Sequence, residues 1–201
     1  MRRIHVFGDE AGDFVFQPPR EGISRYFIIG TVTLEDCSIG DELLALRREL
    51  AWEGLHLDSF HATTDRQAIR NQVFERIAAC SGLRFDATIL DKRKTIEKYR
   101  RDPILFYKLA WYLHFKFVAP RIASFNDSLL VVASSLMINR KKKAVKEAVE
   151  SVVMQVAPTL NYESSFLPAL CDPCLQVADY CTWALQRKYE QFEDTRSYDL
   201  I

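Results

Sequence analysis

The sequence predicts an α/β fold in which a mixed central β-sheet is flanked by helices. Two strand-like segments come first, at residues 4–8 and 26–34, and later strand-like segments alternate with helical ones. Two consecutive strands are typical of antiparallel neighbours, whereas strands that alternate with helices are typical of parallel pairing with helical crossovers. The 201 residues, 48% of them hydrophobic, suffice for one well-buried core, and no change of composition divides them. We therefore expect a single domain over 1–201.

The first half of the chain contains two strands and two helices. The β-branched segments 4–8 and 26–34 predict strands joined as an antiparallel hairpin. Leucines at helical spacing predict a helix over 39–52, and apolar residues at the same spacing predict another over 65–80. Asp65 has the side chain and the position of an N-cap for the second helix.

The remaining elements alternate. Segment 83–90 predicts a strand, and a helix is expected over 104–118, introduced by Asp102-Pro103 and ended by Pro120. The nearly continuous apolar run at 128–133 is typical of a strand covered on both faces. An amphipathic helix over 141–156, a short strand near 165–167 and a last helix over 174–189 complete the pattern.

Composition excludes several classes of protein. There are 27 Lys plus Arg and 27 Asp plus Glu, so the net charge does not predict binding to nucleic acid or membrane, and a charged partner would need a local patch. The N-terminal apolar run is too short for a signal peptide, and no stretch approaches the roughly 18 apolar residues of a membrane span. We expect a cytoplasmic protein with no membrane partner.

The five cysteines do not suggest a disulfide framework, because their number is odd and no secretory signal precedes them. Cys171 and Cys174 form a C-x-x-C motif, which is compatible with half of a zinc site or with a redox pair. No second metal-binding half accompanies it. Small buried hydrophobic residues at a helix start are the simpler interpretation.

Three acids have settings that differ from those of solvated surface acids. Asp9 and Glu10 follow the first strand, and Asp179 lies on the last helix at the border of the predicted buried face. If the fold brings them together, their like charges require a cation, and hard oxygen ligands favour Mg²⁺ or Mn²⁺. The alternatives are a solvated helix aspartate at 179 and a turn acid pair at 9 and 10.

Three blocks of sequence resemble a known family. Phe7 to Asp13 is similar to the Asp-Glu-Ser-Gly signature of the prokaryotic domain-of-unknown-function family 3800, 60–70 resembles its Phe-His-Ala-x-x-Asp-x-Gln block, and 175–198 resembles its C-terminal block. The resemblance covers essentially the whole chain. It implies a ribonuclease H-like fold in which Asp9 is the metal-binding acid of the first strand and Asp179 that of the last helix.

The chain also departs from this family. Relatives commonly carry an aspartate after the strand that matches 129–133, and Ser134 stands at that position here. In ribonuclease H-like enzymes this acid is a principal metal ligand, so its loss removes a charge and a ligand. Asp91, at the end of strand 83–90, and Asp127 are the acids in the sequence that could replace it.

The resemblance implies phosphodiester hydrolysis of DNA or RNA, because two divalent ions held by acids can activate water and stabilise a leaving oxygen. Asp9, Glu10, Asp179 and His61 are the candidate catalytic residues, with Asp9 and Asp179 as metal ligands. His61 could carry a proton, or could pair with Asp65 in a loop. His5 and His114 lie in apolar runs and are expected to be structural.

Two basic clusters could hold a nucleic-acid backbone, one at Arg140, Lys141, Lys142 and Lys143 and one within 92–101. The alternative is that both are ordinary helix charges balanced by neighbouring glutamates. A different functional class also fits the sequence, namely a catalytically silent ribonuclease H-like module that binds nucleic acid, a protein partner or a second copy of itself.

Overall fold

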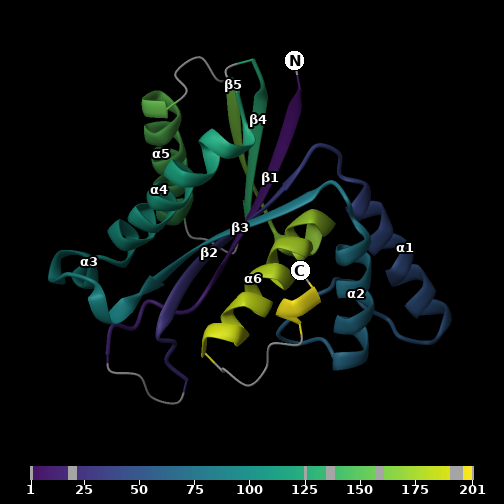
Figure 1. Ribbon diagram of the computed structural model, residues 1–201. Coiled ribbons are helices and arrows are strands. Elements are labelled where there is room, and N and C mark those ends of the chain that lie inside the picture. The colour runs from purple at the N-terminus through teal and green to yellow at the C-terminus, as the bar shows by residue number, and fades with distance from the viewer. Residues whose placement is uncertain are drawn as a thin grey trace.

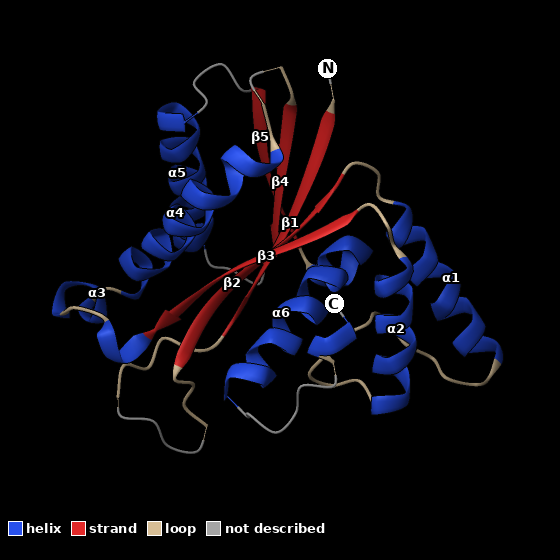
Figure 2. Ribbon diagram, in the orientation of Figure 1, coloured by secondary structure: helices blue, strands red, loops and turns tan. Residues whose placement is uncertain are grey.

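A five-stranded mixed sheet forms the centre of the computed structural model, which describes residues 2–17, 22–124, 126–134, 139–156, 161–190 and 197–200 (Figures 1 and 2). The strands are β1 (Arg3–Ala11), β2 (Tyr26–Leu34), β3 (Leu83–Asp91), β4 (Ser128–Ser134) and β5 (Asn161–Leu167). Their order is β3-β2-β1-β4-β5. The pairs β1–β2 and β2–β3 are antiparallel, and β1–β4 and β4–β5 are parallel. The predicted α/β class with a mixed sheet is confirmed, and so is the antiparallel pairing of the first two strands.

Helices cover both faces of the sheet (Figure 2). Helices α4 (Pro103–Ile122) and α5 (Asn139–Val156) lie on one face, and α1 (Ser38–Trp52), α2 (Gln67–Ala79) and α6 (Pro173–Glu190) lie on the other. Short helical segments complete the chain: η1 (Lys92–Lys94), α3 (Glu97–Arg101), η2 (Ala169–Cys171) and η3 (Tyr198–Leu200). No helix in the described part of the chain has the length and apolar character needed to cross a membrane.

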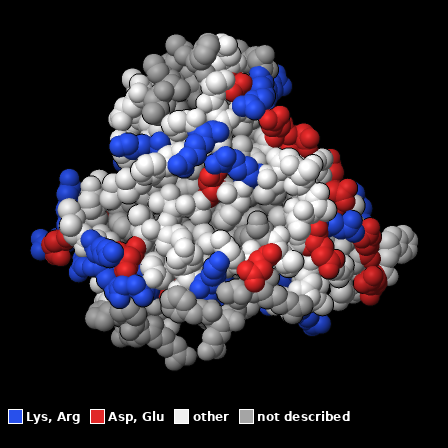
Figure 3. Space-filling view, in the orientation of Figure 1, with Lys and Arg blue, Asp and Glu red and all other residues white. Residues whose placement is uncertain are grey.

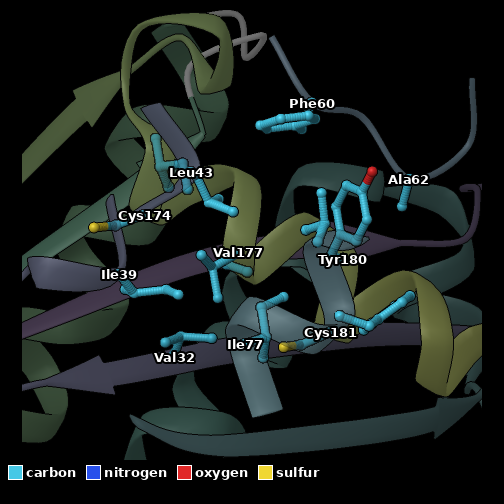
Figure 4. Close-up of a cluster of buried hydrophobic side chains, with 14 of the residues drawn as sticks. Val32, Ile39, Leu43, Phe60, Ala62, Ile77, Cys174, Val177, Tyr180 and Cys181 are labelled. Carbon is cyan, nitrogen blue, oxygen red and sulfur yellow. The ribbon is translucent and has the colours of Figure 1, made fainter. Parts of the chain in front are cut away.

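Each face of the sheet carries its own hydrophobic cluster. Alternation along β1 sends Ile4 and Val6 toward α4 and α5, and Phe7 toward α6. We call the cluster under α4 and α5 the α4 cluster and the cluster under α1, α2 and α6 the α6 cluster. Buried residues of the α6 cluster include Val32 of β2, Leu43 of α1 and Val177 of α6 (Figure 4). The α6 face is therefore closed by three helices, of which α6 lies directly against β1 and β2.

Several boundaries differ from the sequence prediction. Strand β1 extends to Ala11 and not only over 4–8, so Asp9 and Glu10 lie within the strand and do not follow it, because both pair with β2. Helix α2 begins at Gln67 and its N-cap position is Arg66, so the prediction that Asp65 caps this helix is wrong. Pro120 lies inside the last turn of α4 and does not end it, because a proline there removes only one intrahelical hydrogen bond and Ala123 N still donates to Ala119 O. Strand β5 is longer than the short strand expected near 165–167, because it pairs with β4 along its whole length.

Gly30 controls how closely α6 approaches the sheet. It lies opposite Asp9 in the β1–β2 register, and a Cβ atom at this position would overlap Thr182 Oγ1 of α6. A glycine inside a strand often marks such a close approach of another element.

We expect Gly30→Ala to lower the free energy of unfolding by about 1–3 kcal/mol, the usual cost of overpacking. Combining it with Thr182→Ala should recover most of that loss, since the second change removes the overlapping hydroxyl oxygen. Urea denaturation of the two single variants and the double variant measures this coupling. Gly82→Ala is the control, because nothing lies within 4 Å of a Cβ atom there. Equal losses at positions 30 and 82 would contradict the packing argument.

Candidate active site

Residues from opposite ends of the sequence line one cavity of about 540 Å³. Its walls come from the end of β1, the loop before α2, the end of β4, the segment before α6 and α6 itself. They comprise Asp9, Glu10, Ala11, Gly12, Ser59, Phe60, His61, Thr63, Ser134, Pro168, Ala169, Leu170, Asp179, Trp183 and Gln186. All four candidate catalytic residues are among them.

The strand alternation separates Asp9 from Glu10. Asp9 follows Phe7 on the face covered by α6, whereas the Glu10 side chain accepts a hydrogen bond of 3.0 Å from Tyr107 OH of α4. Burial and the neighbouring Glu10 carboxylate raise the pKa of the Tyr107 hydroxyl well above its ordinary value, so Tyr107 stays a neutral donor. Asp9 and Asp179 are therefore the acids that face each other across the α6 side of the sheet.

Asp9 lies in an environment that disfavours its charge. Burial raises the pKa of this carboxyl well above its ordinary value, and the neighbouring Asp179 and Glu10 carboxylates raise it further. A backbone hydrogen bond at Glu10 and the nearby His61 oppose the shift without overcoming it. Asp9 and Asp179 thus form a half-buried pair of like charges, and a cation would relieve their repulsion.

Asp179 is held in place by two hydrogen bonds to one of its oxygens. Oδ2 accepts from Ala62 N at 2.8 Å and lies 3.1 Å from Nδ1 of His61. The Asp179 side chain is 14% exposed and that of His61 is 55% exposed. Hydrogen bonding to Asp179 raises the pKa of the His61 imidazole above its ordinary value. The expected pairing of His61 with Asp65 occurs only through the backbone, since the ring itself faces Asp179.

The loop that supplies these donors is fixed to α6 by two buried polar side chains. Asp65 Oδ2 accepts hydrogen bonds from His61 N, at 2.8 Å, and from Tyr180 OH. Gln176 accepts from Phe60 N at 3.1 Å and donates to Ala169 O at 2.9 Å, so it links two walls of the cavity. Asp65 and Gln176 are 9% and 3% exposed. The sequence did not predict that Asp65 and Gln176 fix this loop to α6. Its only indication was that they lie in the segments 60–70 and 175–198, which resemble the family.

Ser134 lies beside Asp9 in the cavity wall. Gly8 pairs with Ala133 in the parallel β1–β4 register, which brings the next residues, Asp9 and Ser134, side by side. Ala133 belongs to the α4 cluster and Val132 to the α6 cluster, so alternation turns Ser134 toward α6. A neutral hydroxyl, 6% exposed, therefore stands where the resemblance leads one to expect an acid.

Neither of the suggested replacement acids reaches the cavity. Asp91 ends β3 and binds Arg93 and Arg25, at 2.6 and 3.2 Å. Asp127 precedes β4 and binds Arg2 at 3.1 Å and Ser124 N at 2.8 Å. Both are committed to ion pairs away from the residues that line the cavity. The suggestion that one of them substitutes for the missing acid is wrong.

The donor set of the cavity fits a hard divalent cation. Across the described ranges of the chain, no group of three or more His, Cys, Asp or Glu side chains is arranged to hold a metal ion. Mg²⁺, however, keeps several waters and is commonly bound by one or two carboxylates together with substrate phosphate oxygens. Asp9 and Asp179 supply two such carboxylates, in a place where like charges call for a cation.

The remaining histidines and the C-x-x-C cysteines lie away from the cavity walls. His114 is buried between Thr31 Oγ1 at 2.8 Å and Thr88 Oγ1 at 3.0 Å, and burial lowers its pKa to about 4, so it is structural as expected. His5 stacks on Phe7, and its Nδ1 has no hydrogen-bond partner among the described residues. Cys174 is buried and Cys171 exposed, and both are free thiols.

The basic cluster 140–143 is only partly described, because the side chains of Arg140 and Lys141 lie outside the described residues. Lys143 is exposed and lies 3.8 Å from Glu147 on the same helix. Lys142 is half-buried. The pairing with Glu147 agrees with a helix charge balanced by a neighbouring glutamate.

We expect Asp179→Asn to lower the pKa of His61 toward its ordinary value of about 6.5, because the change removes the carboxylate that stabilises the imidazolium. An NMR titration of the His61 ring measures this directly. Asp58→Asn makes the same substitution at an exposed site and should leave the titration unchanged. A His61 pKa that stays the same in Asp179→Asn would contradict the assigned hydrogen bond.

Comparison with known proteins adds no family assignment. No protein-family model matches this sequence, and a search of curated proteins finds no significant match. The function must therefore be argued from the residues and geometry of the site.

Proposed function

We propose that this protein is a divalent-metal-dependent phosphodiesterase that acts on DNA or RNA and has a ribonuclease H-like fold. The observation that carries the proposal is the meeting of Asp9 and Asp179 in one cavity although 170 positions of sequence separate them. The mixed sheet supports the resemblance, which implies a first strand bearing one acid and a last helix bearing another.

Asp9 and Asp179 are the residues that would hold the ion. Asp9 lies within β1, where it pairs with Gly30 of β2, so it cannot move without disturbing the sheet. Two donors fix Oδ2 of Asp179. Ser134 adds a hydroxyl oxygen beside Asp9. A bound Mg²⁺ or Mn²⁺ ion supplies an activated water and charge stabilisation at the leaving oxygen of a phosphodiester.

His61 is placed to exchange a proton with the substrate or with solvent. Its Nδ1 faces Asp179, which leaves Nε2 as the ring atom free to take or give a proton. Because Asp179 raises its pKa, a larger fraction of the imidazole is protonated near neutral pH. That state suits donation to a leaving oxygen, which is the general-acid half of the reaction.

A second candidate function rests on Ser134. A serine in place of the expected acid leaves two facing carboxylates, and a second ion would lack the bridging charge that a two-metal mechanism uses. The second candidate is therefore a module that binds nucleic acid or a protein partner without cleaving it. Hydrolysis by the wild-type protein separates the two candidates.

The test uses labelled single-stranded, duplex and hybrid oligonucleotides with Mg²⁺, Mn²⁺ or EDTA. We expect cleavage that needs the metal and that falls about 100-fold or more in Asp9→Asn/Asp179→Asn. Asp41→Asn/Asp58→Asn, with both changes at exposed positions, should cleave like the wild type. Cleavage that persists in EDTA or in the Asp9/Asp179 variant would overturn the proposal, and no cleavage at all would favour the binding module.

A further inference from the structure

The protein has no net charge, but its basic and acidic side chains are concentrated in different segments. Residues 91–101 contain six basic and two acidic side chains, whereas 35–58 contain seven acidic and two basic ones. Figure 3 shows the result on one face: acidic side chains gather over α1 at the right, and basic side chains gather around α3 at the left. A polyanion approaching this face would be drawn toward the η1–α3 end.

The described lining of the cavity supplies no cationic side chain for the phosphates that flank a scissile bond. Asp9, Glu10 and Asp179 line it, and none of the described lining residues is lysine or arginine. A metal ion offsets the charge at one phosphate, but the neighbouring phosphates of a nucleic-acid strand need cations outside the cavity. The basic end of the molecule is the place to look for them.

A second pocket at that end is lined by Arg25, Arg93 and Arg100, together with Phe16, and has a volume of about 280 Å³. We call these three arginines the arginine pocket. Arg25 and Arg93 share Asp91, at 3.2 and 2.6 Å, so one acid serves two guanidinium groups. Among the described residues, Arg100 donates to the backbone carbonyls of Thr95 and Arg93. Nε of Arg25 is buried and has no hydrogen-bond partner within the described residues. The pocket thus keeps an excess of positive charge.

The arginine pocket is joined to the cavity by the chain that follows β1. Lys92, which also lines the pocket, is 4% exposed and binds Asp13 Oδ1 at 2.7 Å. Asp13 lies four residues after Asp9, at most about 14 Å along an extended chain. The sheet register agrees, because Ala11 pairs with Ile28 of β2, and Tyr26 pairs with Asp91 of β3. Cavity and pocket therefore lie at the same end of strands β1, β2 and β3.

We propose that the arginine pocket, with the exposed Lys94 of η1 and Lys98 of α3, binds backbone phosphates of a single-stranded nucleic acid whose scissile bond lies at Asp9 and Asp179. The proposal rests on the proposed function for the position of the scissile bond. A single strand can turn within a few nucleotides from the cavity into a concave pocket, whereas a duplex has a persistence length of about 150 bp and cannot. Guanidinium groups suit this task because they bind phosphate oxygens in pairs.

The experiment measures binding without cleavage, by fluorescence anisotropy of labelled single-stranded DNA and RNA in EDTA over a series of salt concentrations. The test variant is Lys94→Gln/Lys98→Gln/Arg100→Gln. The matched control is Arg47→Gln/Arg48→Gln/Arg121→Gln, which removes the same charge from α1 and from the end of α4. Arg121 lines a pocket with Arg2 and Ile4, which lies at the opposite end of the strands from the arginine pocket. Circular dichroism melts show whether each variant is folded.

We expect the test variant to bind single strands about tenfold or more weakly at low salt, and the slope of log K against log salt to become smaller by about 2, since each lost phosphate contact contributes roughly 0.7. The control should bind like the wild type. Equal weakening in both variants would overturn the site, because it would show only a response to net charge. Tighter binding of duplex than of single strands, or of anionic lipid vesicles than of either, would overturn the proposed partner.

These outcomes are separate from those that test catalysis. Asp9→Asn should bind single strands in EDTA at least as well as the wild type, because it removes a negative charge next to the path of the strand. If no variant cleaves but Lys94→Gln/Lys98→Gln/Arg100→Gln alone loses binding, the binding surface is supported and hydrolysis is not. If cleavage is intact but binding does not change on substitution of positions 94, 98 and 100, hydrolysis is supported and the binding surface is not.

Discussion

Asp9→Asn is expected to raise the thermal midpoint of unfolding in EDTA. The substitution removes a buried charge next to Asp179 and Glu10 while it keeps the shape of the side chain. Relief of about 1 kcal/mol corresponds to roughly 2–4 °C for a chain of this length. With Mn²⁺ the order should reverse, because an ion at 100 times its Kd adds about 2.7 kcal/mol to the wild type and loses a ligand in the variant.

The pH dependence of this effect follows from the sign of the pKa shift. The folded pKa of Asp9 lies above its unfolded value of about 3.9, so both states are neutral at lower pH and the charge destabilises the fold only as pH rises through and beyond that value. The advantage of Asp9→Asn in EDTA should therefore be small near pH 3.5 and larger near pH 7. Differential scanning calorimetry at both pH values measures it.

The exposed Asp58→Asn is the control and should change neither the melt in EDTA nor the response to Mn²⁺. If Asp9→Asn were less stable than the wild type in EDTA at pH 7, the carboxylate would be making a stabilising contact and the like-charge interpretation would be wrong. If Mn²⁺ stabilised both proteins equally, the ion would be bound elsewhere.

Ser134→Asp is expected to create or increase cleavage that depends on Mg²⁺ or Mn²⁺. The new carboxylate would stand beside Asp9 and on the same face of the sheet, where it supplies the bridging charge that a second ion needs. We expect an increase of about tenfold or more over the wild type. The same change should lower the midpoint of unfolding in EDTA, because a third carboxylate is then crowded into a buried site.

Two further variants make this result interpretable. Ser134→Asp/Asp9→Asn should lose the gain, because one carboxylate of the enlarged set is removed. Ser128→Asp places the same new acid at the other end of β4 and should give no gain. Robust cleavage by the wild type that Ser134→Asp does not enhance would mean that the site is complete without an acid at 134.

Much of the architecture was predictable from local patterns. The strand at 26–34 and the helix over 39–52 were found within one residue of their observed bounds, because β-branched runs and leucines at helical spacing are local signals. The N-cap at Asp102 was also predictable, since its carboxylate accepts from Ile104 N and Leu105 N, only two and three residues away. Asp65 failed as an N-cap because Tyr180, 115 positions away, competes for its carboxylate.

Local patterns in the sequence were enough to predict the α/β class and the order of the elements, and they singled out Asp9 and Asp179 as candidate acids. The tertiary structure alone decided that Glu10 turns away toward Tyr107, that Gly30 admits α6 beside Asp9, and that Asp91 and Asp127 are bound in ion pairs elsewhere. The physical reason is that periodicity reports which face of its own element a residue occupies. Which partner meets that face depends on packing between segments far apart in the chain.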